Sequence, residues 1–116
     1  MKKLLAIGEA LIDFIPAQRD CLLKEVEQFT RVCGGAPANV AAAAAKLGGD
    51  SSLISQLGRD AFGDYIVDTL AAAGVDTSKI CRTDRANTAL AFVSLKADGN
   101  RDFSFYRKPS ADMLLE

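Results

Sequence analysis

A pair of glycines followed shortly by an asparagine is the part of this sequence best suited to gripping a ligand. Gly34 and Gly35 carry no Cβ, so the backbone there can come close to a bound molecule. Pro37 presets the first turn of a helix whose free N–H groups face the same space. Asn39 lies within that turn, and its amide offers both donors and an acceptor. Such a loop suits a polyhydroxylated ligand better than a purely apolar one.

Asp13 is the carboxylate that we single out to join this loop. It lies in an apolar stretch that predicts a buried strand, and α/β proteins bind ligands in the crevice beyond the carboxyl ends of their strands. A carboxylate there can accept hydrogen bonds from two hydroxyl groups of a ligand. The residues alone also allow a solvated turn aspartate before Pro16, an ordinary tight turn at Gly34 and Gly35, and an ordinary first-turn helix residue at Asn39.

Alternating strands and helices are expected to position these residues. The order of apolar runs, caps and glycines predicts a β-α-β-α-β arrangement, which implies a parallel sheet covered by helices. Residues 11–15 are expected to continue the first strand past Gly8. The alanine run of the first helix predicts close packing on the sheet. The predicted elements are strands at 4–7, 11–15, 52–57 and around Ile80, and helices at 37–47 and from the Asp60 cap to about Ala73.

The pattern changes in the last third of the sequence. Residues 88–96 alternate in polarity, and a second strand is expected at 102–107. The Asp98-Gly99 pair between them is typical of the turn of a β-hairpin.

Composition limits the kinds of partner. The 116 residues are 49% hydrophobic and carry a net charge of -1, which favours one domain and gives no basic field for nucleic acid or an anionic membrane. The apolar stretches are shorter than the ~20 residues that span a bilayer. Three cysteines and no histidine argue against a disulfide framework or a zinc site and favour a reducing cytoplasm. We expect a small-molecule partner, no nucleic acid and no membrane.

Six separated segments of the sequence form an ordered set of motifs. They are Gly8-Glu9-Ala10-Leu11-Ile12-Asp13, Gly34-Gly35-Ala36-Pro37-Ala38-Asn39-Val40-Ala41, Lys46-Leu47-Gly48, Gln56–Asp64, Asn87–Val93 and Arg101–Leu115. In this order they resemble those of the ribokinase-type (pfkB) carbohydrate kinases. The last segment is similar to the fructokinase branch in particular, and the resemblance covers nearly the whole chain.

The resemblance implies a fold and a set of sugar-binding residues. The fold would be α/β, with a ribokinase-like Rossmann-type parallel sheet flanked by helices and a small β lid over the sugar. The core would comprise residues 1–15 and 34–84, and the lid strands would lie at about 16–33 and 86–108. Members of this family bind the sugar through residues that correspond here to Asp13, Gly34, Gly35 and Asn39.

Three further side chains are candidates for sugar contact. Phe92 and Phe105 could lay their rings against the carbon skeleton of the sugar, or they could form the small core of the lid. Arg107 could hold a ring hydroxyl or a substrate carboxylate, or it could be a solvated or ion-paired surface residue.

The resemblance implies transfer of the ATP γ-phosphate to a fructose hydroxyl, with Mg²⁺. A 2-keto-3-deoxygluconate kinase, in which Arg107 pairs with the substrate carboxylate, and a non-catalytic sugar-binding or assembly module are alternatives. The family's catalytic aspartate and nucleotide pocket belong to a second signature that the sequence, which ends at Glu116, does not contain. On its own the chain is therefore expected to be inactive and to bind neither ATP nor Mg²⁺ tightly. Separately, a homodimer is expected to form through the lid.

Overall fold

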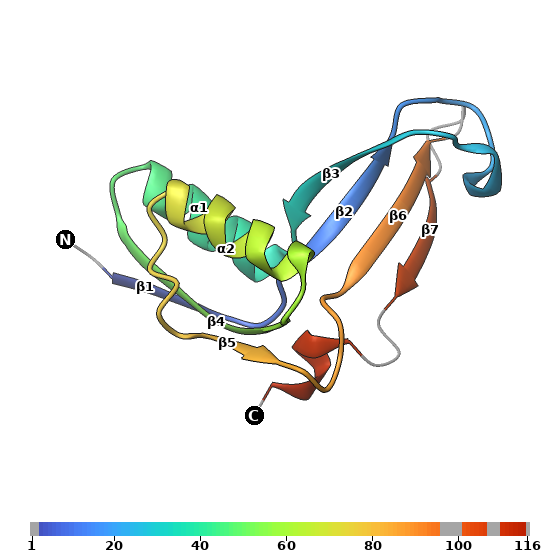
Figure 1. Ribbon diagram of the computed structural model, residues 1–116. Helices are drawn as coiled ribbons and strands as arrows, with labels where there is room; N and C mark the ends of the chain where they lie inside the picture. The colour runs from blue at the N-terminus through green and yellow to red at the C-terminus, as the bar shows by residue number, and fades with distance from the viewer. Residues whose placement is uncertain (1–2, 96–100, 107–109, 116) are drawn as a thin grey trace.

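The computed structural model describes residues 3–95, 101–106 and 110–115, which form two sheets, two α-helices and two short 3-10 helices (Figure 1). One sheet is parallel, with the strand order β1-β4-β5. Both α-helices lie on the same side of this sheet, and the alternating order predicted from the sequence is confirmed. The parallel sheet and its helices are made, in chain order, by β1 (Lys3–Ile7), α1 (Ala36–Lys46), β4 (Asp50–Gly58), α2 (Ala61–Ala72) and β5 (Ile80–Thr83).

The second sheet has four strands in the order β3-β2-β6-β7 and extends away from the helices (Figure 1). Strands β2 and β6 are parallel, whereas the two outer pairs are antiparallel. The predicted Asp98-Gly99 turn lies outside the described residues. The elements of this part are β2 (Leu11–Pro16), η1 (Leu23–Glu25), β3 (Phe29–Gly34), β6 (Leu90–Leu95) and β7 (Arg101–Tyr106), with η2 (Ala111–Leu114) after them.

One segment differs from the sequence-based expectation. Residues 11–15 were expected to extend the first strand of the parallel sheet, but they belong to β2 in the four-stranded sheet. The chain leaves the parallel sheet at Gly8, whose φ of +139° is open only to glycine, and whose N–H still donates to Ile54 O. Ile12 N then donates to Ala89 O, at the start of the new sheet. An apolar run on its own does not tell which sheet it joins.

The helix ends follow the signals in the sequence. Asp60 caps α2, and its Oδ1 accepts a hydrogen bond of 2.7 Å from Gly63 N. Gly48 and Gly74, with φ of +88° and +97°, follow the two helices. Among the described residues, no helix has the length and apolar character needed to cross a membrane.

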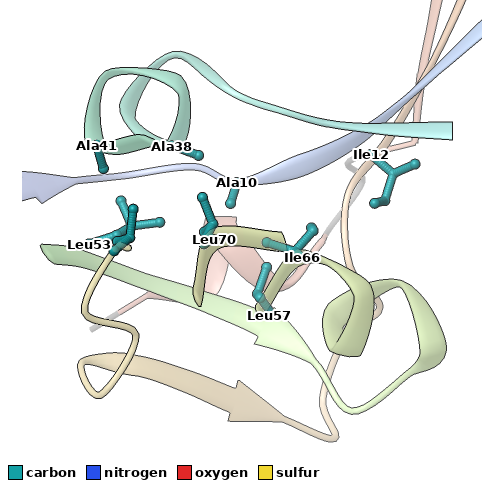
Figure 2. Close-up of a cluster of buried hydrophobic side chains, with 9 residues drawn as sticks. Ala10, Ile12, Ala38, Ala41, Leu53, Leu57, Ile66 and Leu70 are labelled. Atoms are coloured by element: carbon teal, nitrogen blue, oxygen red, sulfur yellow. The ribbon is translucent and has the colours of Figure 1, made fainter. Parts of the chain in front are cut away.

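The main core lies between the two α-helices and the parallel sheet (Figure 2). Leu53 and Leu57 of β4 are fully buried under Ile66 and Leu70 of α2 and the alanines of α1. Ala41 is fully buried, and its carbonyl accepts a hydrogen bond of 2.7 Å from Ser51 Oγ of β4, so α1 packs closely on the sheet as its alanines predicted. The cluster comprises Ala10, Ile12, Ala38, Ala41, Leu53, Leu57, Ile66, Leu70 and Val75.

Candidate functional site

Asp13 and Gly34 meet at the place where the four-stranded sheet leaves the helical layer. Asp13 lies on β2 opposite Val32, and Gly34 is the last residue of β3. A Cβ on Gly34 would lie 2.9 Å from Asp13 Cγ, and closer still to its Oδ2. A side chain at position 34 would therefore displace the carboxylate of Asp13, which lies across the glycine.

Burial perturbs the carboxyl group of Asp13. It is partly buried, and this burial raises its pKa above the ordinary value of 3.8. Hydrogen-bond donors from a ligand would favour the charged form and lower the pKa again. Burial also raises the pKa of the neighbouring Cys33 thiol, and the charge of Asp13 adds to this effect, so Cys33 stays a neutral thiol.

Gly35 brings two connections of the chain together. Its φ is +97°, and a Cβ on it would lie 2.7 Å from the carbonyl oxygen of Glu9. Gly8 is similarly close to the start of α1, because a Cβ added to it would lie 2.9 Å from Pro37 Cγ. The link from β1 to β2 thus packs against the link from β3 to α1. The glycines are required by the packing of the chain itself, in addition to any ligand.

Asn39 lies one turn into α1, with its backbone N–H donating to Gly35 O at 2.9 Å. It is exposed, and it lines a shallow hollow between α1 and α2 together with Cys33, Lys46 and Thr69. The structure therefore brings the Asp13 side chain to Gly34, whereas the hollow lined by Asn39 does not include Asp13.

Phe92 and Phe105 lie on opposite faces of the four-stranded sheet. Directly paired residues of neighbouring strands point to the same face. Asp13 pairs with Ala91, which pairs with Phe105, so Phe105 shares the face of Asp13 and is 53% exposed there. Phe92 pairs instead with Phe14 and points to the other face. The structure thus groups Phe105 with Asp13 and separates Phe92 from it.

An aromatic cluster occupies the face that carries Phe92. The rings of Phe14 and Phe92 are stacked with centroids 4.5 Å apart, and Phe29 and Tyr106 meet Phe92 edge to face. Phe62 of α2 meets Phe14 edge to face at 5.6 Å, which connects the cluster to the helical layer. The stacking suits a core for the sheet, the second of the two roles considered for Phe92, and Phe92 also lines a hollow with Phe29 and Tyr106. Arg107, the remaining candidate, lies outside the described residues.

A second polar centre joins the two sheets, and only the helix cap at Asp60 was predicted for it. Asp60 Oδ2 accepts from Thr88 N at 2.9 Å, and its Oδ1 accepts from the Thr88 hydroxyl at 2.8 Å. The same hydroxyl accepts from Gly58 N at 3.0 Å, and Thr88 is buried. Arg82 donates to Gly58 O and to Asp64 Oδ1, at 2.9 and 2.7 Å. These contacts fix the segment that leads into β6. The cap at Asp60 was predictable, but a partner in a segment so distant in sequence was not.

The Asp60 carboxylate is held in its charged form by this network. Partial burial acts to raise its pKa, but hydrogen bonds from Thr88 and Gly63, together with the charge of Arg82, outweigh burial and lower the pKa below 3.8. Its stabilising effect is therefore present above the unfolded-state pKa and is lost as the pH falls through the lower folded-state value.

Replacing Asp60 with alanine is expected to lower the free energy of unfolding by about 2–4 kcal/mol at pH 7, because a helix cap and the acceptor for two Thr88 donors are both lost. Urea unfolding measures the change. The exposed control Asp84→Ala, which removes only a distant 3.8 Å ion pair with Arg59, is expected to change stability by less than about 0.5 kcal/mol. The Asp60 effect should shrink below about pH 4. Equal losses for the two variants would contradict a special role for Asp60.

Comparison with known proteins identifies the family. The model of the pfkB family carbohydrate kinases matches residues 1–116. Probable fructokinase-5 of Arabidopsis thaliana is 50% identical over 113 residues, which are 97% of this chain and 35% of that protein. The chain thus spans about a third of the length of the curated relatives it matches.

Solved structures agree in both sequence and fold. The crystal structure of fructokinase from Xylella fastidiosa is 52% identical, with a TM-score of 0.85 over 97% of this chain and 34% of that one, and a fructokinase from that organism has also been crystallised with bound ATP. Fructokinase from Halothermothrix orenii is 35% identical, with a TM-score of 0.90 over 99% of this chain and 40% of that one. The predicted α/β sugar-kinase fold is confirmed, and the chain belongs to the pfkB family of carbohydrate kinases.

Proposed function

We propose that this chain forms the sugar-binding part of a fructokinase-type kinase, which transfers the γ-phosphate of ATP to a hydroxyl group of fructose. The observation that carries the proposal is the partly buried Asp13 carboxylate, which lies across Gly34 and whose pKa is raised. The sequence identity of 50% to several fructokinases supports fructose as the substrate.

The chain's own residues would bind and orient the acceptor sugar. Asp13 would accept hydrogen bonds from two hydroxyl groups, and Asn39 would offer its amide. Phe105, on the same face as Asp13, would cover an apolar side of the ring, and Phe92 would support that sheet from its other face. Holding the reacting hydroxyl in place is a major part of phosphoryl-transfer catalysis.

The nucleotide and metal sites are proposed to lie in the part of these enzymes outside the match. When bound, ATP and Mg²⁺ supply the phosphoryl group and neutralise its charge. Among the described residues, no grouping of three or more Cys, Asp or Glu side chains could hold a metal ion. We propose that the 116-residue chain binds fructose without phosphorylating it.

Two further properties belong to this proposal. A reducing cytoplasm is supported by Cys21, Cys33 and Cys81, which are all free thiols. A homodimer through the four-stranded sheet is supported by the exposed apolar side chains Val32 and Phe105.

The test is calorimetric titration of the 116-residue chain with fructose, with and without Mg-ATP, beside a phosphorylation assay on the same sample. Binding without turnover is the expected result. Absence of fructose binding contradicts the proposal, and turnover contradicts the placement of the catalytic groups elsewhere. A parallel titration with 2-keto-3-deoxygluconate tests the alternative substrate. If that acid binds more tightly than fructose, fructose is not the preferred substrate.

Fructose binding is expected to weaken as the pH falls through the raised pKa of Asp13, because sugar hydroxyls donate to the charged carboxylate and not to the protonated one. Near that pKa, binding should release protons. Titration in buffers of different ionisation enthalpy measures the release. An affinity that stays constant from pH 7 down to the acid limit of folding would show that Asp13 does not contact the sugar.

A further inference from the structure

Helix α2 holds the four-stranded sheet through side chains of its first two turns. In Figure 1 these turns lie beside the start of β2 and the end of β3. Phe62 meets Phe14 of β2 edge to face, with ring centroids 5.6 Å apart. One turn further along α2, the ring of Tyr65 faces the guanidinium group of Arg31 on β3, whose Cζ lies 4.2 Å from the ring centroid. The second polar centre ties the segment before β6 to the same helix, so α2 holds three neighbouring strands.

The three strands held by α2 are those that surround Asp13. Asp13 lies on β2, opposite Val32 of β3 and Ala91 of β6. Phe14 follows Asp13 in the chain, and Arg31 pairs with Phe14 across the two strands. Successive residues of a strand point to opposite faces, and directly paired residues share a face. Phe14 and Arg31 therefore lie on the face opposite Asp13, and the rings of α2 support the strands from the side away from the proposed sugar site.

The contact between Arg31 and Tyr65 bears on the carboxylate of Asp13 through β3. Arg31 and Gly34 both belong to β3, and the Asp13 carboxylate lies across Gly34. A shift of β3 at Arg31 therefore changes the space that the carboxylate occupies. Hydrogen bonds require good distances and angles, and a small misplacement of a binding group is enough to weaken its contacts with a ligand.

We propose that Tyr65 and Arg31 are positioning residues for the sugar: their contact fixes β3 on α2 and so holds the Asp13 carboxylate where it accepts two hydroxyl groups. Both residues lie outside the six sequence segments that resemble the carbohydrate kinases, and neither touches the sugar in this proposal. The inference rests on the proposed function, because it takes Asp13 as a sugar-binding residue.

The first test measures the placement of β3 without a sugar. Amide residual dipolar couplings, measured by NMR on the 116-residue chain, report the orientation of β2 and β3 relative to α1 and α2. The variant Tyr65→Leu should change the couplings of β3 relative to those of the helices. Tyr65→Phe keeps the ring and should retain the couplings of the parent chain. Unchanged relative couplings in Tyr65→Leu would overturn the proposal.

The second test is calorimetric titration with fructose at pH 7, beside urea unfolding of the same variants. We expect Tyr65→Leu and Arg31→Gln each to weaken fructose binding about two- to fivefold, the range that corresponds to one cation–π contact at a partly exposed site. The double variant should lose no more than Tyr65→Leu alone, because both changes remove the same contact. Tyr65→Phe should bind like the parent chain. So should the matched control Arg59→Gln, which removes the same charge from an exposed arginine in a loose ion pair with Asp84.

A purely structural role for the pair predicts a different pattern. If Tyr65→Leu and Arg31→Gln lower the free energy of unfolding but bind fructose as tightly as the parent chain, the proposal is wrong. It is also wrong if the loss in the double variant is the product of the two single losses, because the two residues would then act independently. If the parent chain itself does not bind fructose, the proposed function fails, and the dipolar couplings still decide whether Tyr65 fixes β3 on α2.

Discussion

Replacing Asp13 with asparagine is expected to weaken fructose binding about 100-fold, because two hydrogen bonds from sugar hydroxyls to a charged carboxylate, each contributing about 1.5 kcal/mol, are lost or made neutral. Calorimetric titration at pH 7 measures the loss. The same substitution is not expected to lower stability. Burial raises the pKa of Asp13, so its charge opposes folding at neutral pH, and an uncharged amide of similar shape removes that opposition.

The combination of weaker binding and undiminished stability separates a ligand-binding role from a structural one. Asp84→Asn is the matched control, since it also removes one carboxylate charge but at an exposed position in a loose ion pair with Arg59. It should leave both quantities unchanged. If Asp13→Asn bound fructose as tightly as the parent chain, Asp13 would be a solvated strand residue without a role in binding the sugar.

Replacing Gly35 with alanine is expected to lower the free energy of unfolding by about 3–4 kcal/mol, of which about 1–2 kcal/mol comes from the positive φ alone. The rest comes from crowding, since the added Cβ would lie 2.7 Å from the carbonyl oxygen of Glu9, a backbone atom that cannot rotate away. Urea unfolding at pH 7 measures the change.

Gly48 provides the control that separates these two causes. Its φ of +88° is close to that of Gly35, but a Cβ there would meet nothing within 4 Å. Gly48→Ala should therefore show only the conformational part, about 1–2 kcal/mol. Equal losses at the two glycines would mean that the links between the sheets do not press on each other at Gly35.

Local signals in the sequence were sufficient for the helical layer. Asp60, Gly48 and Gly74 are caps whose effect depends on neighbouring backbone groups, and the observed ends of α1 and α2 lie within one residue of the predicted ones. Contact between Asp13 and Gly34 was not predictable from spacing. It depends on the pairing of β2 with β3, which brings residues distant in sequence to adjacent positions.

The two faces of the four-stranded sheet show why the remaining contacts of the site could not be predicted from the sequence. Phe92 and Phe105 are aromatic residues on β6 and β7, and only the register of β6 against β2 and β7 places them on opposite sides. The Asp60–Thr88 contact has the same origin, because it joins the start of a helix to the entry of a strand in the other sheet. Residue type indicates which contacts a side chain can make, whereas the pairing of strands decides on which face of the sheet that side chain lies.

The parallel pairing of β2 with β6 has a consequence for the order of folding. The two central strands of the four-stranded sheet come from segments far apart in the sequence, with Ile12 beside Leu90. The parallel β1-β4 pair and the helices α1 and α2 use residues made before β6, so they can form before β6 leaves the ribosome. Because closing such a long loop is entropically unfavourable, the sheet that carries Asp13 is expected to be the last part to assemble. Half of the proposed sugar site would thus remain unformed until almost the whole of this stretch has been synthesised.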